Sequence, residues 1–216
     1  FVNFMKLVDS LRRLKIRTNA DTAEDAAKAR SFGAEGIGLF RTEHMFYGKD
    51  SEQPLFFLRK MIISRDERER RAALDELYPF VKKDIRATLE VMSGLPVVIR
   101  LLDPPLHEFV PNREDERAKL SKSLGITAEE LAKRAEALHE SNPMMGHRGV
   151  RLGITYPEIT EMQVRAILES AVELKKAGKR VMPEIMVPVV SVKSELDYQK
   201  RIADKVHDEV CRKYGV

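Results

Sequence analysis

Four arginines stand out as side chains that could bind an anion. Arg41 and Arg100 each come directly after a short apolar run, and Arg148 and Arg151 lie close together in a glycine-punctuated segment. A guanidinium group is a rigid fork of donors that fits a carboxylate or a phosphate in a bidentate manner. A compact, multiply charged anion needs several such groups that converge from separate parts of the chain. We therefore predict that these four arginines line a binding site for such an anion.

Each arginine taken alone has a simpler interpretation. A charged residue at the end of a strand is often only solvated, or it is the partner of a nearby acid, and Glu43 or Asp103 could be that partner. The same pattern recurs after two different apolar runs. This recurrence favours a binding site over a set of isolated surface charges.

Three other residues of chemically active types are assigned structural roles. His44 and His107 follow the same two apolar runs, but neither lies at a metal-binding spacing, and we expect both to be structural or to support the site indirectly. Cys211 lies in an apolar helical pattern and is expected to pack rather than to act as a nucleophile. The sequence thus assigns no catalytic residue and no metal ligand.

The elements that must position the arginines alternate between strands and helices. The sequence predicts a short helix over residues 4–11, a strand over 14–19, a helix from Asp21 to Gly33 and a strand that ends at Arg41. A charged helical stretch interrupted near Pro79 follows, and then a third strand over residues 97–102. These short connections are typical of parallel strand–helix–strand units.

The second half of the chain repeats this order after an excursion. Residues 104–145 are predicted to lie over one end of the sheet, with a helix after Thr127 whose capping box is completed by Glu130. Next come a partly extended segment (142–153), a helix (158–177), a strand (181–190) and a closing helix (192–214). The predicted buried side of the helix at 158–177 consists of Ile159, Met162, Ala166, Ile167 and Val172.

These elements predict an α/β protein with a parallel sheet covered by helices. Four strands are consistent with either an open doubly wound sheet or part of a (β/α)₈ barrel, and periodicity does not choose between them. In both folds, ligands bind beyond the carboxyl ends of the strands, where Arg41 and Arg100 are placed.

Composition describes a soluble globular protein. Of the 216 residues, 43% are hydrophobic and 33% are charged, and 38 basic residues against 34 acidic ones give a net charge of +4. Because the two signs are interspersed, we expect no nucleic-acid partner, and because no apolar stretch is long enough to span a bilayer, we expect no membrane partner. The single cysteine indicates a reducing compartment, with the cytosol expected.

Four segments resemble a known family. The stretches "IRTNADTAEDAAKARSFGAEGIGLFRTEHMF", "PVVIRLLDPPLHEF", "NPMMGHRGVRLGITYPEI" and "PEIMVPVV" are similar to the C-terminal phosphoenolpyruvate/pyruvate-binding domain of the pyruvate, phosphate dikinase family, in the same order and over essentially the whole chain. "FRTE" and "GxRGxR" are shared with phosphoenolpyruvate synthase and Enzyme I of the bacterial sugar phosphotransferase system. "LLDPPLHEF" resembles the dikinases in particular.

The resemblance implies a fold and an activity. The domain is expected to be a (β/α)₈ barrel in which pyruvate receives a phosphoryl group from a phosphohistidine on a separate swivelling domain, to give phosphoenolpyruvate. ATP and inorganic phosphate would be converted to AMP and diphosphate elsewhere in the enzyme. By motif, Arg41 and Arg100 match the arginines that hold the transferred phosphate, and Arg148 and Arg151 match the arginine-bearing segment beside them. A homodimer is expected at full length, in the cytosol, with plastid or glycosome as alternatives.

The family's other motifs do not occur in this sequence. The magnesium ligands and the cysteine acid lie in motifs that resemble "IEIPRA", "GTNDLTQ" and "GxCGEH", so the ligands of the expected Mg²⁺ would lie outside this chain. We therefore expect residues 1–216 to be the N-terminal half of the barrel domain, about its first four β/α units with a helical excursion after the third strand, and to be inactive alone. The alternatives are a synthase or Enzyme I-type phosphotransferase, and a non-catalytic fragment that binds a protein partner.

Overall fold

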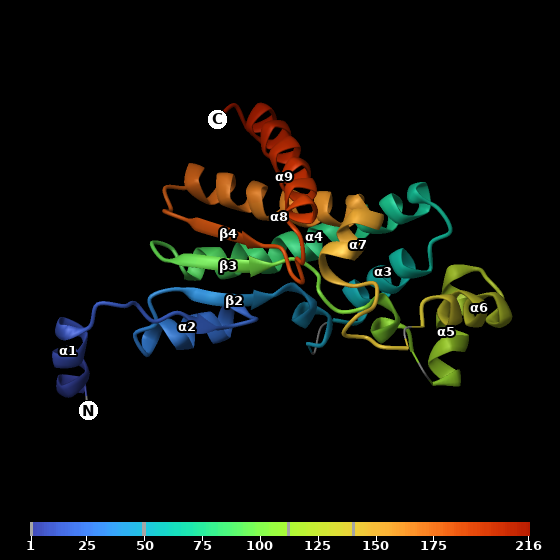
Figure 1. The fold of residues 1–216 in the computed structure, drawn as a ribbon, viewed down its shortest axis with the longest axis horizontal. Helices are drawn as coiled ribbons and strands as arrows, with labels where there is room; N and C mark the ends of the chain where they lie inside the picture. The colour runs from blue at the N-terminus through green and yellow to red at the C-terminus, as the bar shows by residue number, and fades with distance from the viewer. Residues whose placement is uncertain (1, 49–50, 112, 140) are drawn as a thin grey trace.

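The computed structural model describes residues 2–48, 51–111, 113–139 and 141–216. At its centre is a four-stranded sheet in which each neighbouring pair of strands is parallel (Figure 1). The strands are β1 (Thr18–Asn19), β2 (Ile37–Arg41), β3 (Pro96–Arg100) and β4 (Met182–Met186), and they lie side by side in chain order. A doubly wound sheet reverses its strand order at a switch point, and these four strands do not. The fold is that of a partial β/α barrel.

Helices connect the strands and cover one face of the sheet. They are α2 (Ala23–Ser31) between β1 and β2, α3 (Glu52–Ile63) and α4 (Glu67–Val91) before β3, α8 (Pro157–Lys176) before β4, and α9 (Lys193–Tyr214) after it. Helix α4 packs against α2, α3 and α8, and α8 packs against α9, so these helices form a continuous layer (Figure 1).

The core lies between this layer and the sheet. On β3, Val97 and Ile99 are fully buried, whereas Val98 and Arg100 are only half-buried. Because successive side chains of a strand point to opposite faces, Val97 and Ile99 face the helices and Arg100 faces the open side of the sheet. The strand that carries the core therefore also presents an arginine to the opposite face.

In the described residues, three α-helices lie between β3 and α8. They are α5 (Glu114–Leu124), α6 (Ala128–Ala137) and α7 (Gly149–Thr155), and α5 and α6 lie beyond the carboxyl ends of the strands (Figure 1). The predicted start of α6 is confirmed, since Thr127 is the N-cap and its side chain accepts a hydrogen bond from the backbone N–H of Glu130 at 3.1 Å. The predicted capping box is only half formed, because the carboxylate of Glu130 pairs with Arg134 and not with the backbone N–H of Thr127.

The predicted break at Pro79 is wrong. The helical stretch is interrupted at residues 64–66 instead, where Asp66 caps α4 by accepting a hydrogen bond from Glu69 N–H at 2.8 Å. Pro79 lies inside α4 on its exposed side, where the helix continues past it. A side-chain cap therefore sets the boundary.

Several other predicted details need correction. Strand β1 covers only residues 18–19 of the predicted 14–19, β3 covers Pro96–Arg100 rather than residues 97–102, and β4 ends at Met186 rather than at residue 190. The segment predicted as partly extended becomes the short helix α7 from Gly149 onward. On α8, Met162 and Val172 are only half-buried, and the buried stripe instead includes polar residues, among them Gln163 and Glu169.

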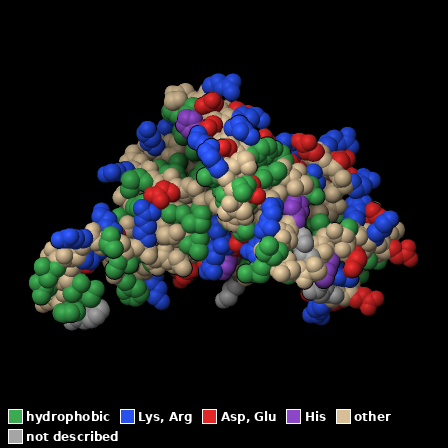
Figure 2. All heavy atoms as spheres, viewed as in Figure 1, with side chains coloured by type: hydrophobic (Ala, Val, Ile, Leu, Met, Phe, Trp, Pro, Cys, Tyr) green, Lys and Arg blue, Asp and Glu red, His purple; other side chains and the backbone are tan. Residues whose placement is uncertain are grey.

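Helix α1 (Val2–Leu11) lies apart from the sheet and exposes apolar side chains. Phe4, Leu7 and Leu11 are among the most exposed large hydrophobic residues, and apolar side chains gather at this end of the molecule (Figure 2). Among the described residues, no helix is both long and apolar enough to cross a membrane.

Candidate anion-binding site

The site is built on the last residues of β2 and β3. Arg41 and Arg100 are direct register partners of these two parallel strands. Partners in adjacent parallel strands lie on the same face of the sheet, so both arginines belong to the face opposite the helical layer. The structure thus places Arg41 and Arg100 at the same carboxyl edge of the sheet, as predicted from the sequence, with their Cα atoms paired.

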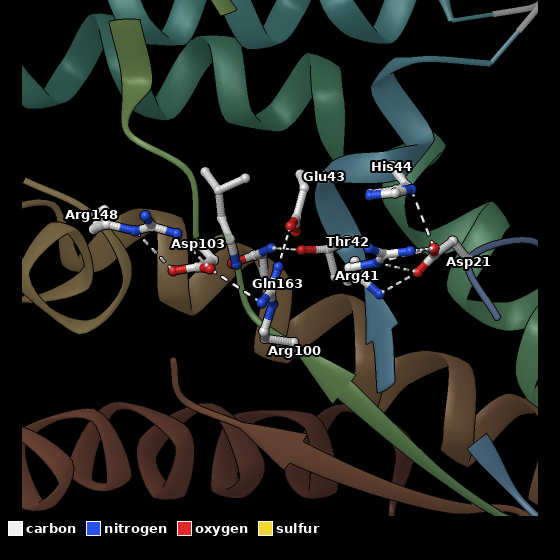
Figure 3. A network of polar contacts seen from close by, with 10 residues as sticks. Asp21, Arg41, Thr42, Glu43, His44, Arg100, Asp103, Arg148 and Gln163 are labelled. Carbon is white, nitrogen blue, oxygen red and sulfur yellow. Dashed lines mark hydrogen bonds and ion pairs between the residues drawn. The ribbon is translucent and has the colours of Figure 1, made fainter. Parts of the chain in front are cut away.

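Asp21, at the end of the β1 segment, holds Arg41. Its carboxylate accepts hydrogen bonds from the backbone N–H of Arg41 at 2.9 Å and from Nε and Nη2 of the guanidinium at 3.1 and 2.5 Å (Figure 3). Burial acts to raise the pKa of Asp21, but the hydrogen bonds from Arg41 outweigh it, so that pKa lies below its usual range. These hydrogen bonds in turn raise the pKa of Arg41. Within the described residues, Nη1 of Arg41 has no protein partner.

The same carboxylate also orients His44. The Nδ1 atom of His44 lies 3.2 Å from Oδ2 of Asp21, and the imidazole is partly exposed. His44 is thus a neighbour of Arg41 through a shared acid, which is consistent with the indirect role predicted for it. His107, in contrast, packs against His139, with ring centroids 5.7 Å apart.

Arg100 lies between two acids. Its Nη2 donates to the buried carboxylate of Glu43, and its Nη1 lies 3.1 Å from Oδ2 of Asp103 (Figure 3). Asp103 also accepts hydrogen bonds from Nε and Nη2 of Arg148, at 3.2 and 2.8 Å. Asp103 therefore joins Arg100 of β3 to Arg148, the residue before α7, although the two arginines lie far apart in the chain.

A glycine allows the approach of Arg148. Gly149 has φ = +54°, and an added Cβ would lie 2.9 Å from the carbonyl oxygen of Pro188 and 2.9 Å from Cγ2 of Val189. Its N–H donates to the backbone carbonyl of Asp103 at 3.1 Å. A left-handed conformation with no room for a side chain is suited only to glycine. Gly149 therefore fixes the start of α7, and with it Arg148, against the loops after β3 and β4.

Among the described contacts, Arg151 is the predicted site residue whose side chain shares neither an acid nor a strand pairing with the others. It lies on α7, and its Nη1 donates to the backbone carbonyl of Met145 at 2.8 Å. Its Nε is buried and makes no hydrogen bond within the described part of the chain. Arg41, Arg100 and Arg148 thus form the core of the site, with Arg151 beside it.

Two residues of the site were not identified from the sequence. Asp21 was interpreted only as the start of a helix, whereas Thr22 is the N-cap of α2 and Asp21 binds Arg41. Gln163 of α8 makes hydrogen bonds to the segments that follow both strands, and no sequence signal distinguished it from the other polar residues of that helix. Glu43 and Asp103 were recognised as acids that could pair with the arginines, and they do.

The charges of the site nearly balance. Arg41, Arg100 and Arg148 are matched by the carboxylates of Asp21, Glu43 and Asp103, in the contacts described above. Such ion pairs hold guanidinium groups in fixed positions, and they also reduce the positive field that an anion would experience. The simpler interpretation, in which the arginines are partners of nearby acids, is therefore correct. It is compatible with anion binding through guanidinium N–H groups that the acids do not engage.

Comparisons with known proteins agree with this geometry. The sequence profile of the family described as "PEP-utilising enzyme, PEP-binding domain" matches residues 1–216, the whole chain. The chain belongs to this family. The match favours membership of the PEP-utilising enzymes over an unrelated protein with an α/β fold. The candidate site lies at the carboxyl edge of the sheet within the matched residues.

Relatives within the PEP-utilising family share about half of their residues with this chain. It is 52% identical to a pyruvate, phosphate dikinase of Rhizobium meliloti (strain 1021) and 49% identical to one of Clostridium symbiosum, in each case over 100% of this chain and 24% of the relative. It is also 48% identical to a chloroplastic pyruvate, phosphate dikinase of Arabidopsis thaliana, over 98% of this chain and 22% of the relative. The chain thus spans about a quarter of the length of the curated relatives that it matches.

Proposed function

We propose that this chain is the first half of the phosphoenolpyruvate/pyruvate-binding barrel of a pyruvate, phosphate dikinase. The observation that carries the proposal is the register pairing of Arg41 with Arg100, with each guanidinium oriented by a carboxylate. The membership of the PEP-binding family and the named dikinase relatives support the same assignment. The substrate of this site is phosphoenolpyruvate in one direction and pyruvate in the other.

The chemistry explains why arginines are needed. Pyruvate loses a proton from its methyl carbon to form the enolate, the enolate oxygen forms a bond to phosphorus, and the phosphorus–nitrogen bond of a phosphohistidine breaks. Negative charge is shared between the enolate oxygen and the phosphoryl group in the transition state. Fixed donors from Arg41 and Arg100 stabilise that charge without rearranging, and this is the main contribution a protein makes to phosphoryl transfer.

The chain's own acids do not fit a magnesium site. The dikinase resemblance implies Mg²⁺, but Asp21, Glu43 and Asp103 are each engaged by an arginine. No cluster of three or more His, Cys, Asp or Glu side chains that could hold a metal occurs within residues 2–48, 51–111, 113–139 and 141–216. We therefore assign no step to the ion here. Its ligands, the proton donor and the phosphohistidine domain are proposed to lie in other parts of the enzyme, which is expected to be a homodimer.

The requirement for inorganic phosphate tests the proposal. The longest reading frame that contains this sequence should form phosphoenolpyruvate from ATP and pyruvate only when inorganic phosphate is supplied, and diphosphate should be a product. Formation of phosphoenolpyruvate without inorganic phosphate would assign the protein to the synthases instead. The absence of any phosphoryl transfer to pyruvate would leave the non-catalytic alternative.

A further inference from the structure

A buried glutamine joins the two strands that carry the arginines. Gln163 lies on α8 and is 5% exposed. Its Oε1 accepts a hydrogen bond from the backbone N–H of Leu102 at 3.1 Å, and its Nε2 donates to Oγ1 of Thr42 at 3.1 Å (Figure 3). Both ends of the amide are therefore engaged, one with the segment after β2 and the other with the segment after β3.

The backbone hydrogen bonds between β2 and β3 do not extend to the residues that Gln163 binds. The pairing of β2 with β3 ends at Arg41 and Arg100, and the next N–H, that of Leu101, donates to the carbonyl of Met186 at 3.0 Å. Leu102 is buried, and its N–H would have no backbone acceptor without Gln163. Buried backbone donors are almost always paired, so the amide replaces a missing strand partner.

The two residues that Gln163 binds are next to charged residues of the site. Thr42 lies between Arg41 and Glu43 in the sequence, and Leu102 immediately precedes Asp103. The ion pair of Arg100 with Glu43 closes across the same gap that the amide spans, whereas Asp103 belongs to the same segment as Arg100. A change in the separation of the two segments would alter the pair of Arg100 with Glu43 and the relative placement of the guanidinium groups of Arg41 and Arg100.

We infer that Gln163 is a positioning residue that fixes the separation of the segments that follow β2 and β3, and through it the relative placement of the guanidinium groups of the two phosphate-binding arginines. It does not contact the proposed substrate, and it acts through Thr42 and Leu102. This inference rests on the proposed function and adds to it a residue far from the site in sequence. Displacement of a positioned group by about 1 Å can reduce a reaction rate about 100-fold, so a tie of this kind affects catalysis as well as folding.

A second buried glutamine provides a matched control. Gln199 of α9 is 2% exposed, and its Oε1 accepts a hydrogen bond from Thr160 Oγ1 at 2.8 Å. It connects α9 to α8 and does not contact the strand ends. Replacement of either glutamine with methionine removes a buried amide while keeping a side chain of similar length. Only Gln163→Met would release the segments that directly follow Arg41 and Arg100 from each other.

The experiment measures two half-reactions in the full-length enzyme. For Gln163→Met we expect the exchange between pyruvate and phosphoenolpyruvate to lose about 10- to 100-fold in kcat/KM. The exchange between ATP and AMP, which the dikinase assignment places elsewhere, should stay within about twofold of wild type. Gln199→Met should leave both exchanges within the same twofold range, and its melting temperature measures the effect of losing a buried amide that does not contact the strand ends. Thr42→Val removes one of the two hydrogen bonds and should give an intermediate loss, which keeps the test available should Gln163→Met fold poorly.

Two results would overturn the inference. One is pyruvate exchange at wild-type kcat/KM in Gln163→Met or, where that variant folds poorly, in Thr42→Val. The other is an equal loss in both half-reactions, or the same loss in Gln199→Met, since either would indicate a purely structural role. A failure of the proposed function is distinguishable from these outcomes, because in that case the wild-type enzyme itself would not exchange pyruvate with phosphoenolpyruvate.

Discussion

Arg41 and Arg100 are register partners at the carboxyl ends of adjacent parallel strands, and each is held by an acid from a different segment. The sheet fixes the backbone beneath the two guanidinium groups, while Asp21 and Glu43 fix the groups themselves. An arginine held in this way loses less conformational freedom when it binds a ligand. The pair is therefore already in place for the compact anion that we propose to bind here.

Replacement of Arg100 with lysine should reduce the exchange of pyruvate with phosphoenolpyruvate about 10²- to 10³-fold, since lysine retains the charge but cannot donate in a fork. The matched control is Arg113→Lys, because Arg113 is largely exposed and pairs with Asp115. The control should remain near wild type in steady-state assays of the full-length enzyme. Equal activity of the two variants would show that the fork of Arg100 is not used.

Replacement of Gly149 with alanine should weaken phosphoenolpyruvate binding and destabilise the protein by about 1–3 kcal/mol, because Ala would combine a strained φ with a steric clash against Pro188 and Val189. Gly125→Ala separates the two effects. Gly125 has φ = +66° but nothing within 4 Å of its added Cβ, so this variant should show the cost of strain alone, about 1 kcal/mol, with unchanged ligand affinity. Urea unfolding and calorimetric titration provide the two readouts. An identical response of both glycines would argue against the close approach at α7.

The free energy of unfolding should decrease at acid pH, in part because Glu169 in the helical layer becomes protonated. Burial acts to raise the pKa of Glu169, but hydrogen bonds from Lys213, Tyr78 and Lys82 outweigh it and lower the pKa to about 2. A carboxyl group whose pKa is lowered on folding stabilises the protein fully above its unfolded value of 4.5, and that stabilisation is lost as the pH falls toward 2.

Glu169→Gln should therefore be less stable than wild type at pH 7, and the difference should shrink between pH 4.5 and pH 2. Urea unfolding at several pH values measures this directly, because urea does not screen charges. Glu129, an acid near the start of α6 with no ion pair among the contacts of the described residues, is the matched site for a glutamine control. Parallel loss of stability in wild type and Glu169→Gln across this range would exclude the assigned role.

The 216-residue chain alone should show no turnover with phosphoenolpyruvate and magnesium. The three acids of the candidate site are engaged by arginines, and the proton donor and phosphohistidine domain of the proposed reaction are assigned to other parts of the enzyme. A coupled assay for pyruvate formation, read against a blank without protein, checks this. The prediction would be contradicted by pyruvate formation above the blank, provided that this activity copurifies with the chain and is abolished by Arg100→Lys.

The sequence predicted the strands and the arginines at their ends because both depend on local patterns. An apolar run identifies a buried strand, and a charged residue that follows it must lie at the edge of the sheet. Arg41 and Arg100 were placed in this way, and Thr127 was recognised as a cap by its own local pattern.

The connections between these elements were not predictable in the same way. Gln163 binds Thr42 across 121 residues of sequence and Leu102 across 61, and no local periodicity records such a contact. Asp21 belongs to a residue type that is common at helix starts, so its role as a partner of Arg41 was hidden by a more frequent use. Pro79 was misjudged because a proline on the exposed side of a long helix can be accommodated, as it is in α4.

The central claim is that Arg41 and Arg100 together hold the phosphate of phosphoenolpyruvate. A crystal structure of the full-length enzyme with this ligand bound tests it most directly. We predict that phosphate oxygens lie about 3 Å from guanidinium nitrogens of both arginines. A phosphate that contacts neither residue, with Arg41 and Arg100 bound only to Asp21, Glu43 and Asp103, would contradict the account.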